Sequence, residues 1–157
     1  PRLRVLGVPD LHAPFLSDLV THAPLVEHLE ASGVENCEEL TRLPRLHTLA
    51  LRFCFGSAEL FLGAADLAVL ITMPSLRRFS ICDCDVHLWA GVMRQLVTAG
   101  SQSPISALSA RLHARREHLT AQIPSLQSAD VLSRAVFPLL RHVDVACPAE
   151  AAADMSF

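Results

Sequence analysis

Two thiols and one imidazole stand close together in the segment Cys82-Asp-Cys84-Asp-Val-His87. Thiolate sulfur and imidazole nitrogen are ligands that zinc prefers, so this segment carries the right atoms for a metal site. Both sulfurs would face one way only if a strand continued regularly through Cys84, because residues two apart in a strand share a side. A structural zinc site uses four ligands, and a fourth is missing near this segment.

The motifs of common catalytic sites are absent from the sequence. It contains no Gly-x-Ser-x-Gly turn, no glycine-rich phosphate loop and no His-Glu-x-x-His pair. The 8 histidines are scattered, and Arg115-Arg-Glu-His118 fits a solvated helical face. We therefore expect a protein that is not an enzyme and has no cofactor, with an enzyme as the alternative class.

One phrase recurs along the chain and organises it. A proline is followed within two residues by an aliphatic residue that opens the pattern Leu-x-x-Leu-x-Leu. The opening residues of the copies are Leu3, Val26, Leu46, Leu76, Ile105 and Leu140. The copies that open at Leu46 and Leu76 also carry cysteine at the ninth position, Cys54 and Cys84. A phrase repeated every 20 to 35 residues or so indicates stacked units, each too small to bury a core of its own.

Each copy predicts a strand, in which alternate side chains point to opposite faces. The apolar positions should then point into a core shared by all units. These inner residues, expected to be buried in one parallel sheet, are Leu49, Leu51, Phe79, Ile81, Leu108, Val143 and Val145.

Apolar spacing of three or four residues predicts helices between the strands. We expect helices over 58–70 and 86–99, and a single helical turn over 37–43. In the longest unit we expect one helix over 111–123 and a second over 128–137, separated by a break at the intervening proline. The proline ahead of each strand suits a helix-to-strand junction, since it disfavours helix at the residue before it.

With these phrases and ninth-position cysteines, the chain resembles the leucine-rich repeat family, of the cysteine-containing intracellular type seen in the repeat portion of F-box proteins. The resemblance implies an α/β solenoid with a parallel sheet on the concave face and helices and turns on the convex face. It implies a repeat domain over residues 1–148, with about six repeats starting near 3, 26, 46, 76, 105 and 140, and a C-terminal tail over 149–157. In this repeat the strand ends near Cys84 and buries its side chain, so we expect no metal site there.

Composition limits the partners and the compartment. Hydrophobic residues make up 51% of the chain, and the apolar stretch around 60–73 is broken by Gly63 and Asp66, so we expect no membrane span. A net charge of -3 argues against nucleic acid. The 5 cysteines show no paired extracellular pattern, which favours an intracellular, cytoplasmic protein.

Two further features of the composition have competing interpretations. The chain has no lysine and no tyrosine, which a GC-rich genome explains better than selection against ubiquitin attachment sites. It opens in a repeat at Pro1, with no polar cap before it, so we expect a fragment, a processed chain or a subunit covered by a neighbour.

The family resemblance implies a protein–protein interaction scaffold, a leucine-rich repeat subunit or adaptor within a hetero-complex or larger chain. The alternative is the repeat portion of an F-box-type ubiquitin-ligase substrate receptor, which an F-box upstream would distinguish. Other proteins should bind the concave face, and we expect three arginines to occupy equivalent positions on its strands: Arg52, Arg78 and Arg111. The complete set of predicted binding residues is His28, Glu30, Arg52, Arg78, Ser80, Ser109, Arg111, His142 and Asp144.

Overall fold

The computed structural model describes residues 3–52, 63–113 and 132–146. Its strands are β1 (Val5–Leu11), β2 (His28–Val34), β3 (Thr48–Arg52), β4 (Arg78–Asp85), β5 (Ala107–His113) and β6 (His142–Ala146). Its helices are α1 (Ala13–His22), the 3-10 helix η1 (Cys37–Arg42), α2 (Ala64–Thr72) and α3 (Val86–Thr98). Each of the six strands begins two residues after an opening residue identified in the sequence.

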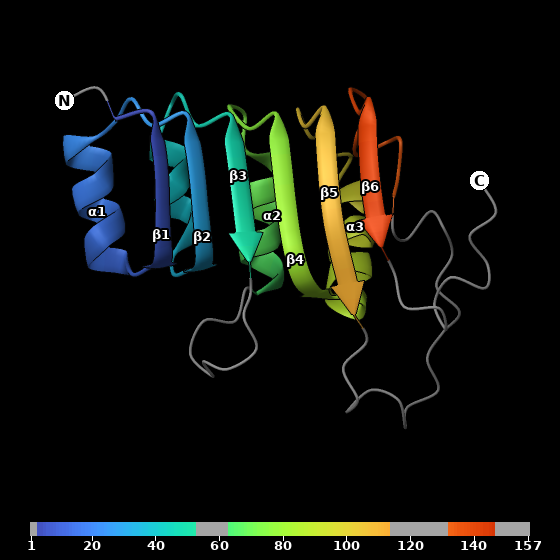
Figure 1. Ribbon diagram of the computed structural model, residues 1–157. Helices are drawn as coiled ribbons and strands as arrows, with labels where there is room; N and C mark the ends of the chain where they lie inside the picture. The colour runs from blue at the N-terminus through green and yellow to red at the C-terminus, as the bar shows by residue number, and fades with distance from the viewer. Residues whose placement is uncertain (1–2, 53–62, 114–131, 147–157) are drawn as a thin grey trace.

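The described strands form one parallel sheet in the order of the chain, β1-β2-β3-β4-β5-β6. The helices lie together on one side of this sheet, as Figure 1 shows, and each contacts the next in the layer. The α/β class and the parallel sheet are therefore confirmed. None of the helices in the described ranges combines the length and apolar character needed to cross a bilayer.

The prolines form a recurring tight turn before the strands. The amides of Val26, Leu46 and Leu76 donate to the carbonyl three residues earlier, over 3.2, 3.2 and 3.1 Å, and a proline directly follows each accepting residue. Proline suits this position because its φ is already that of the turn. Before β5 the Ser103 hydroxyl oxygen takes the place of a carbonyl, and it accepts from the Ile105 amide at 3.3 Å.

A second recurring contact sets the register between units. Two successive amides of each unit donate to a single carbonyl of the unit before it, at N–O distances of 2.8 to 3.2 Å. The accepting carbonyls belong to Arg4, Glu27, His47, Arg77 and Ser106. Because each strand starts from the same contact, equivalent residues of neighbouring strands come to lie side by side.

The core lies between the sheet and the helices. The opening residues Val26, Leu46, Leu76 and Ile105 are fully buried. The predicted inner residues of the central strands are also buried, each at most 2% exposed: Leu49, Leu51, Phe79, Ile81 and Leu108.

The prediction of burial is wrong for the last strand. Val143 is 49% exposed, and Val145 is only partly buried. β6 stands at the edge of the sheet and pairs with β5 alone, so the described residues supply no further unit to cover it.

Three predicted helical segments agree with the structure. α3 buries the predicted stripe of Val86, Trp89, Val92, Met93 and Leu96. η1 is the single helical turn expected over 37–43. α2 covers the second half of the segment predicted over 58–70, whose first five residues lie outside the described part.

Three other helical expectations differ from the structure. α1 was not predicted, although Pro14 in its first turn and the buried pair Leu16 and Leu19 were signals for it. A helix was expected to begin at residue 111, but residues 111–113 belong to β5, which continues to His113. A second helix was expected over 128–137, but residues 134–136 of this segment form a turn. Pro138 follows the segment directly and disfavours helix at the residue before it. The remaining residues of these two segments lie outside the described part.

The join between β4 and α3 has no loop. Asp83 has a φ of 60°, and the pairing of β4 with β5 shifts between Ile81 and Cys84. The Asp85 carboxylate then caps α3 by accepting from the amides of His87 and Leu88, both at 2.9 Å. β4 ends at Asp85, one residue after Cys84, so the strand ends near Cys84 as expected, and the burial of Cys84 is also confirmed.

Candidate binding face

The sheet has one face free of described helices, which we call the open face (Figure 1). Its strand residues alternate with those expected to point into the core, and all are exposed or partly exposed. They are Val5, Gly7 and Pro9; His28, Glu30 and Ser32; Thr48, Ala50 and Arg52; Arg78, Ser80 and Cys82; Ala107, Ser109 and Arg111; His142, Asp144 and Ala146. The strand pattern therefore identified the orientation of every predicted binding residue correctly.

Residues paired across the strands form rows on this face. The first row runs Thr48, Arg78, Ala107, His142, and His28 joins it from β2. The second row runs Ala50, Ser80, Ser109, Asp144, and Glu30 joins it from β2. Most of the predicted site thus falls into two adjacent rows.

The three arginines do not occupy equivalent positions, and this prediction is wrong. Arg78 pairs with Thr48 and lies at the start of its strand, whereas Arg52 pairs with Cys82 at the end of its strand. Four residues of strand separate the two positions along the strand direction, which is roughly 13 Å. Arg111 pairs with Ala146 and also lies near the far end of the sheet.

Arg52 is also engaged within the protein. Its guanidinium lies 2.9 Å from the carboxylate of Glu30 on the neighbouring strand. The charge of Arg52 is therefore balanced across β2 and β3, and this part of the open face presents an internally neutralised pair.

The open face is hollowed over the first two rows from β3 to β6. The hollow has a volume of about 500 Å³ and is lined by Thr48, Leu49, Arg78, Phe79, Ser80, Ala107, Leu108, Ser109, Arg141, His142, Val143 and Asp144. Ala107 stands between Arg78 and His142 in the first row. A short side chain flanked by long ones accounts for the depression.

The charged groups of the hollow are not neutralised in the way that Arg52 is. Neither guanidinium, of Arg78 or of Arg141, has an ion pair or side-chain hydrogen bond among the described residues. The Asp144 carboxylate likewise has no ion pair or side-chain hydrogen bond among the described residues. The hollow thus contains charged hydrogen-bonding groups that remain available to a ligand.

Arg141 was missed in the sequence. It directly precedes β6, and its amide makes the recurring contact with the Ser106 carbonyl of the previous unit. Because Arg141 precedes the strand, the alternation of strand residues does not identify it.

Comparison with protein-family models, with curated proteins and with solved structures gives no match for this chain.

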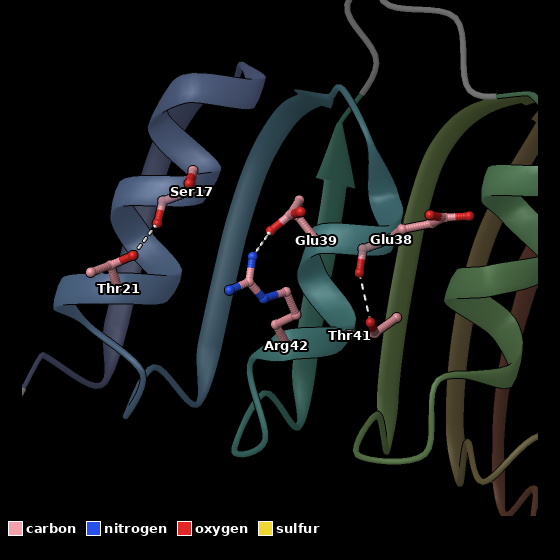
Figure 2. A network of polar contacts seen from close by, with 6 residues as sticks. All are labelled: Ser17, Thr21, Glu38, Glu39, Thr41 and Arg42. Carbon is pink, nitrogen blue, oxygen red and sulfur yellow. Dashed lines mark hydrogen bonds and ion pairs between the residues drawn. The ribbon is translucent and has the colours of Figure 1, made fainter.

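The helical side of the protein differs from the open face, because its polar side chains bond locally. Thr21 donates to the Ser17 carbonyl at 2.8 Å, and Thr41 donates to the Glu38 carbonyl at 2.6 Å (Figure 2). The Arg42 guanidinium lies 2.7 Å from the Glu39 carboxylate of the same helix. These groups are satisfied within α1 and η1, whereas the arginines of the hollow are not satisfied within the described chain.

The cysteine-rich segment does not assemble its thiols on one side. Cys84 is buried in the core, while Cys82 lies on the open face and is partly exposed. Burial, together with the nearby Asp85 carboxylate, raises the pKa of Cys84 to about 12. Zinc binds the thiolate, so the raised pKa adds to the cost of binding a metal at Cys84. Within the described ranges, no three histidine, cysteine or acidic side chains gather in a way that could hold a metal.

Proposed function

We propose that this chain is a leucine-rich repeat solenoid that acts as a non-catalytic scaffold and binds another protein on its open face. The interpretation as a solenoid is supported by the recurring proline turn and by the carbonyl that accepts hydrogen bonds from two amides of the next unit. It is also supported by the buried opening residues at the start of successive strands. Units that repeat the same contacts stack in one direction and create an extended surface.

The observation that carries the proposal is the contrast between the two sides of the sheet. Apolar side chains and helices fill one side, and the other presents mostly polar residues, exposed or partly exposed, in ordered rows. Six parallel strands at about 4.8 Å spacing extend over roughly 24 Å, which accommodates a helix or an extended segment of a partner. A partner protein would add the layer that this side of the sheet lacks.

The chemistry of the hollow supports binding over catalysis. A serine nucleophile requires a base within hydrogen-bonding reach. Neither Ser80 nor Ser109 makes a side-chain hydrogen bond to His142 among the described residues. Arginine, serine and histidine in a shallow hollow instead offer donors and acceptors to a partner surface, and arginine is enriched where proteins bind one another.

Site-specific photo-crosslinking tests the proposal. A compact aliphatic diazirine amino acid, which leaves the hollow open as a large aromatic ring would not, replaces Ser109, in the second row of the open face, or Ala65, on the exposed side of α2. In cells of the source organism, the variant at position 109 should yield a discrete protein adduct and the matched variant at position 65 should not. Adducts formed only from position 65, or from neither position, would count against the proposal.

A further inference from the structure

The hollow has two walls that differ in charge from its floor. Arg78 on β4 forms one wall, and Arg141, just before β6, and His142, the first residue of β6, form the other. β4 and β6 are separated by β5 alone, which places the two walls about 10 Å apart at the level of the backbone. The floor between them is Ala107 and Ser109, both short, so a side chain of a ligand can enter between the walls.

The two arginines of the hollow differ from the other arginines described on this face. Arg52 is balanced by Glu30 at 2.9 Å, and Arg111 does not line the hollow. Arg78 and Arg141 both line it, and neither has an ion-pair partner among the described residues. Guanidinium groups present a planar fork of donors that matches a carboxylate with two parallel hydrogen bonds.

Asp144 narrows the chemistry of the ligand. Its carboxylate lines the same hollow, in the second row beside Ser109. A phosphate group carries about -1.5 to -2 charges, so it would be repelled by this carboxylate more than a singly charged carboxylate would. Asp144 can instead accept from a backbone amide of the ligand, and such amides adjoin every acidic side chain in a peptide.

We propose that the hollow binds an acidic segment of the partner protein, in which two carboxylates pair with Arg78 and Arg141 while a neighbouring donor pairs with Asp144. This inference rests on the proposed function and specifies the partner's chemistry. The attraction is local, because the chain as a whole carries a net charge of -3 and would repel an acidic peptide at long range.

The test uses a capped tetraglutamate peptide as the probe, titrated into the full chain by calorimetry at low salt. Tetraglutamate should bind, and capped tetraglutamine should not. The double variant Arg78→Gln, Arg141→Gln should weaken tetraglutamate binding at least tenfold. Arg45→Gln is the matched control, since Arg45 is an exposed arginine outside the hollow, and it should change the affinity less than twofold.

A second variant distinguishes binding inside the hollow from attraction by its charged side chains. Ala107→Trp leaves both arginines in place and fills the floor between them. It should weaken tetraglutamate binding as strongly as the double variant does, while circular dichroism stays unchanged. Equal binding by Ala107→Trp and the parent chain would show that the peptide responds to surface charge alone, and it would overturn the assignment.

Further outcomes also decide against the acidic segment. No binding of tetraglutamate, or undiminished binding by the double arginine variant, overturns it. A capped phosphoserine peptide that binds ten times more tightly than tetraglutamate replaces it with a phosphopeptide. A partner adduct at position 109 that persists with both arginines replaced leaves the scaffold function standing and overturns the acidic segment alone.

Discussion

The guanidinium of Arg52 lies 2.9 Å from the carboxylate of Glu30, across the boundary between β2 and β3. Both side chains are exposed, so the pair contributes about 0 to 1 kcal/mol to folding. Its larger consequence concerns binding, because a partner's carboxylate must compete with Glu30 for Arg52. The arginines of the open face should therefore contribute unequally to capture of a partner.

We predict that single charge reversals reveal how much each arginine contributes to capture of the partner. Arg78→Glu should weaken capture of the native partner at least tenfold, whereas Arg52→Glu should weaken it several times less. Reversal of Arg52, Arg78 and Arg111 together should cost well over tenfold, with most of the loss due to Arg78. Titration of the photo-crosslinked partner measures each effect, with circular dichroism as the folding control. A loss for Arg52→Glu as large as that for Arg78→Glu would contradict this ranking.

A pH-dependent contribution to stability should arise at Glu35. Its carboxylate accepts from the Ala13 amide at the start of α1 at 3.1 Å and lies 3.2 Å from the His12 ring. The hydrogen bond from Ala13, and then the contact with His12, lower the Glu35 pKa below its ordinary value of 4.5. A carboxyl group with a lowered folded-state pKa stabilises the folded protein above its unfolded pKa, and that stabilisation disappears as the pH falls through the folded-state value.

The measurement is the free energy of unfolding in urea between pH 3 and pH 7 or so for the parent chain and Glu35→Gln. The difference between the two should be constant at the upper end and should shrink below a pH of about 4.5. Glu38→Gln is the control, because its carboxylate has no ion pair within the described ranges. A difference that is independent of pH over this whole range would exclude the capping role of the Glu35 carboxylate.

Ser103 should be the costliest serine to remove among those described. It is 2% exposed, and its hydroxyl donates to the Ile71 carbonyl at the end of α2 over 2.6 Å. The last carbonyls of a helix have no partner within it, so Ser103→Ala leaves a buried acceptor unsatisfied. The loss of stability should be about 1 to 3 kcal/mol.

Ser101→Ala is the matched control for Ser103→Ala. The Ser101 amide, not its hydroxyl, bonds the Leu96 carbonyl at the end of α3, so the variant should cost less than about 0.5 kcal/mol. Chemical denaturation of the two variants measures the contrast. Equal losses would mean that the hydroxyl of Ser103 does not hold the two units together.

Core truncations should lower the stability more in the centre of the sheet than at its edge. Leu51→Ala and Ile81→Ala remove side chains at most 1% exposed and should each cost about 2 to 5 kcal/mol. Val143→Ala removes a side chain that is 49% exposed and should cost about 1 kcal/mol or less. Urea denaturation provides the values. A cost for Val143→Ala equal to that for Leu51→Ala would indicate that β6 is covered in solution.

The cysteines should react with alkylating reagents in a defined order. Burial raises the pKa of Cys37 and of Cys84 to about 12 each, with further contributions from the carboxylates of Asp66 and Asp85 respectively. The thiolate is the reactive form, so both should resist iodoacetamide at neutral pH in the folded protein. Among the cysteines that the structure describes, Cys82 is partly exposed on the open face and should be modified before Cys37 and Cys84. Peptide mapping by mass spectrometry identifies the order, and early modification of Cys84 would refute its burial.

Local repetition made much of this fold predictable. The strand positions, the two faces of the sheet and α3 follow from residues close together in the chain, whose spacing decides which side they face. The inner positions of β3 and β4 were correct because each strand is central and has a neighbouring strand on either side. Val143 follows the same pattern but lies on the edge strand β6. The residues of β6 themselves do not show that the strand is at the edge.

The errors come from contacts between distant residues. The pairing of β4 with β5 shifts between Ile81 and Cys84, where Asp83 has a positive φ, and the spacing of apolar residues does not reveal this irregularity. Glu35 caps a helix that begins 22 residues earlier, which no short motif reveals. The hollow depends on Arg141 at the corner before β6 and on Arg78, whose position was misassigned by four residues relative to Arg52.

The central claim is that the open face binds a partner protein, and one comparison of affinities tests it most directly. The partner captured from position 109 is titrated against Ser109→Trp, which fills the hollow, and Ala65→Trp, which places the same side chain on the exposed side of α2. Ser109→Trp should weaken the affinity at least tenfold while Ala65→Trp leaves it within twofold. Unchanged affinity for Ser109→Trp with a large loss for Ala65→Trp would place the partner on the helices and contradict the account.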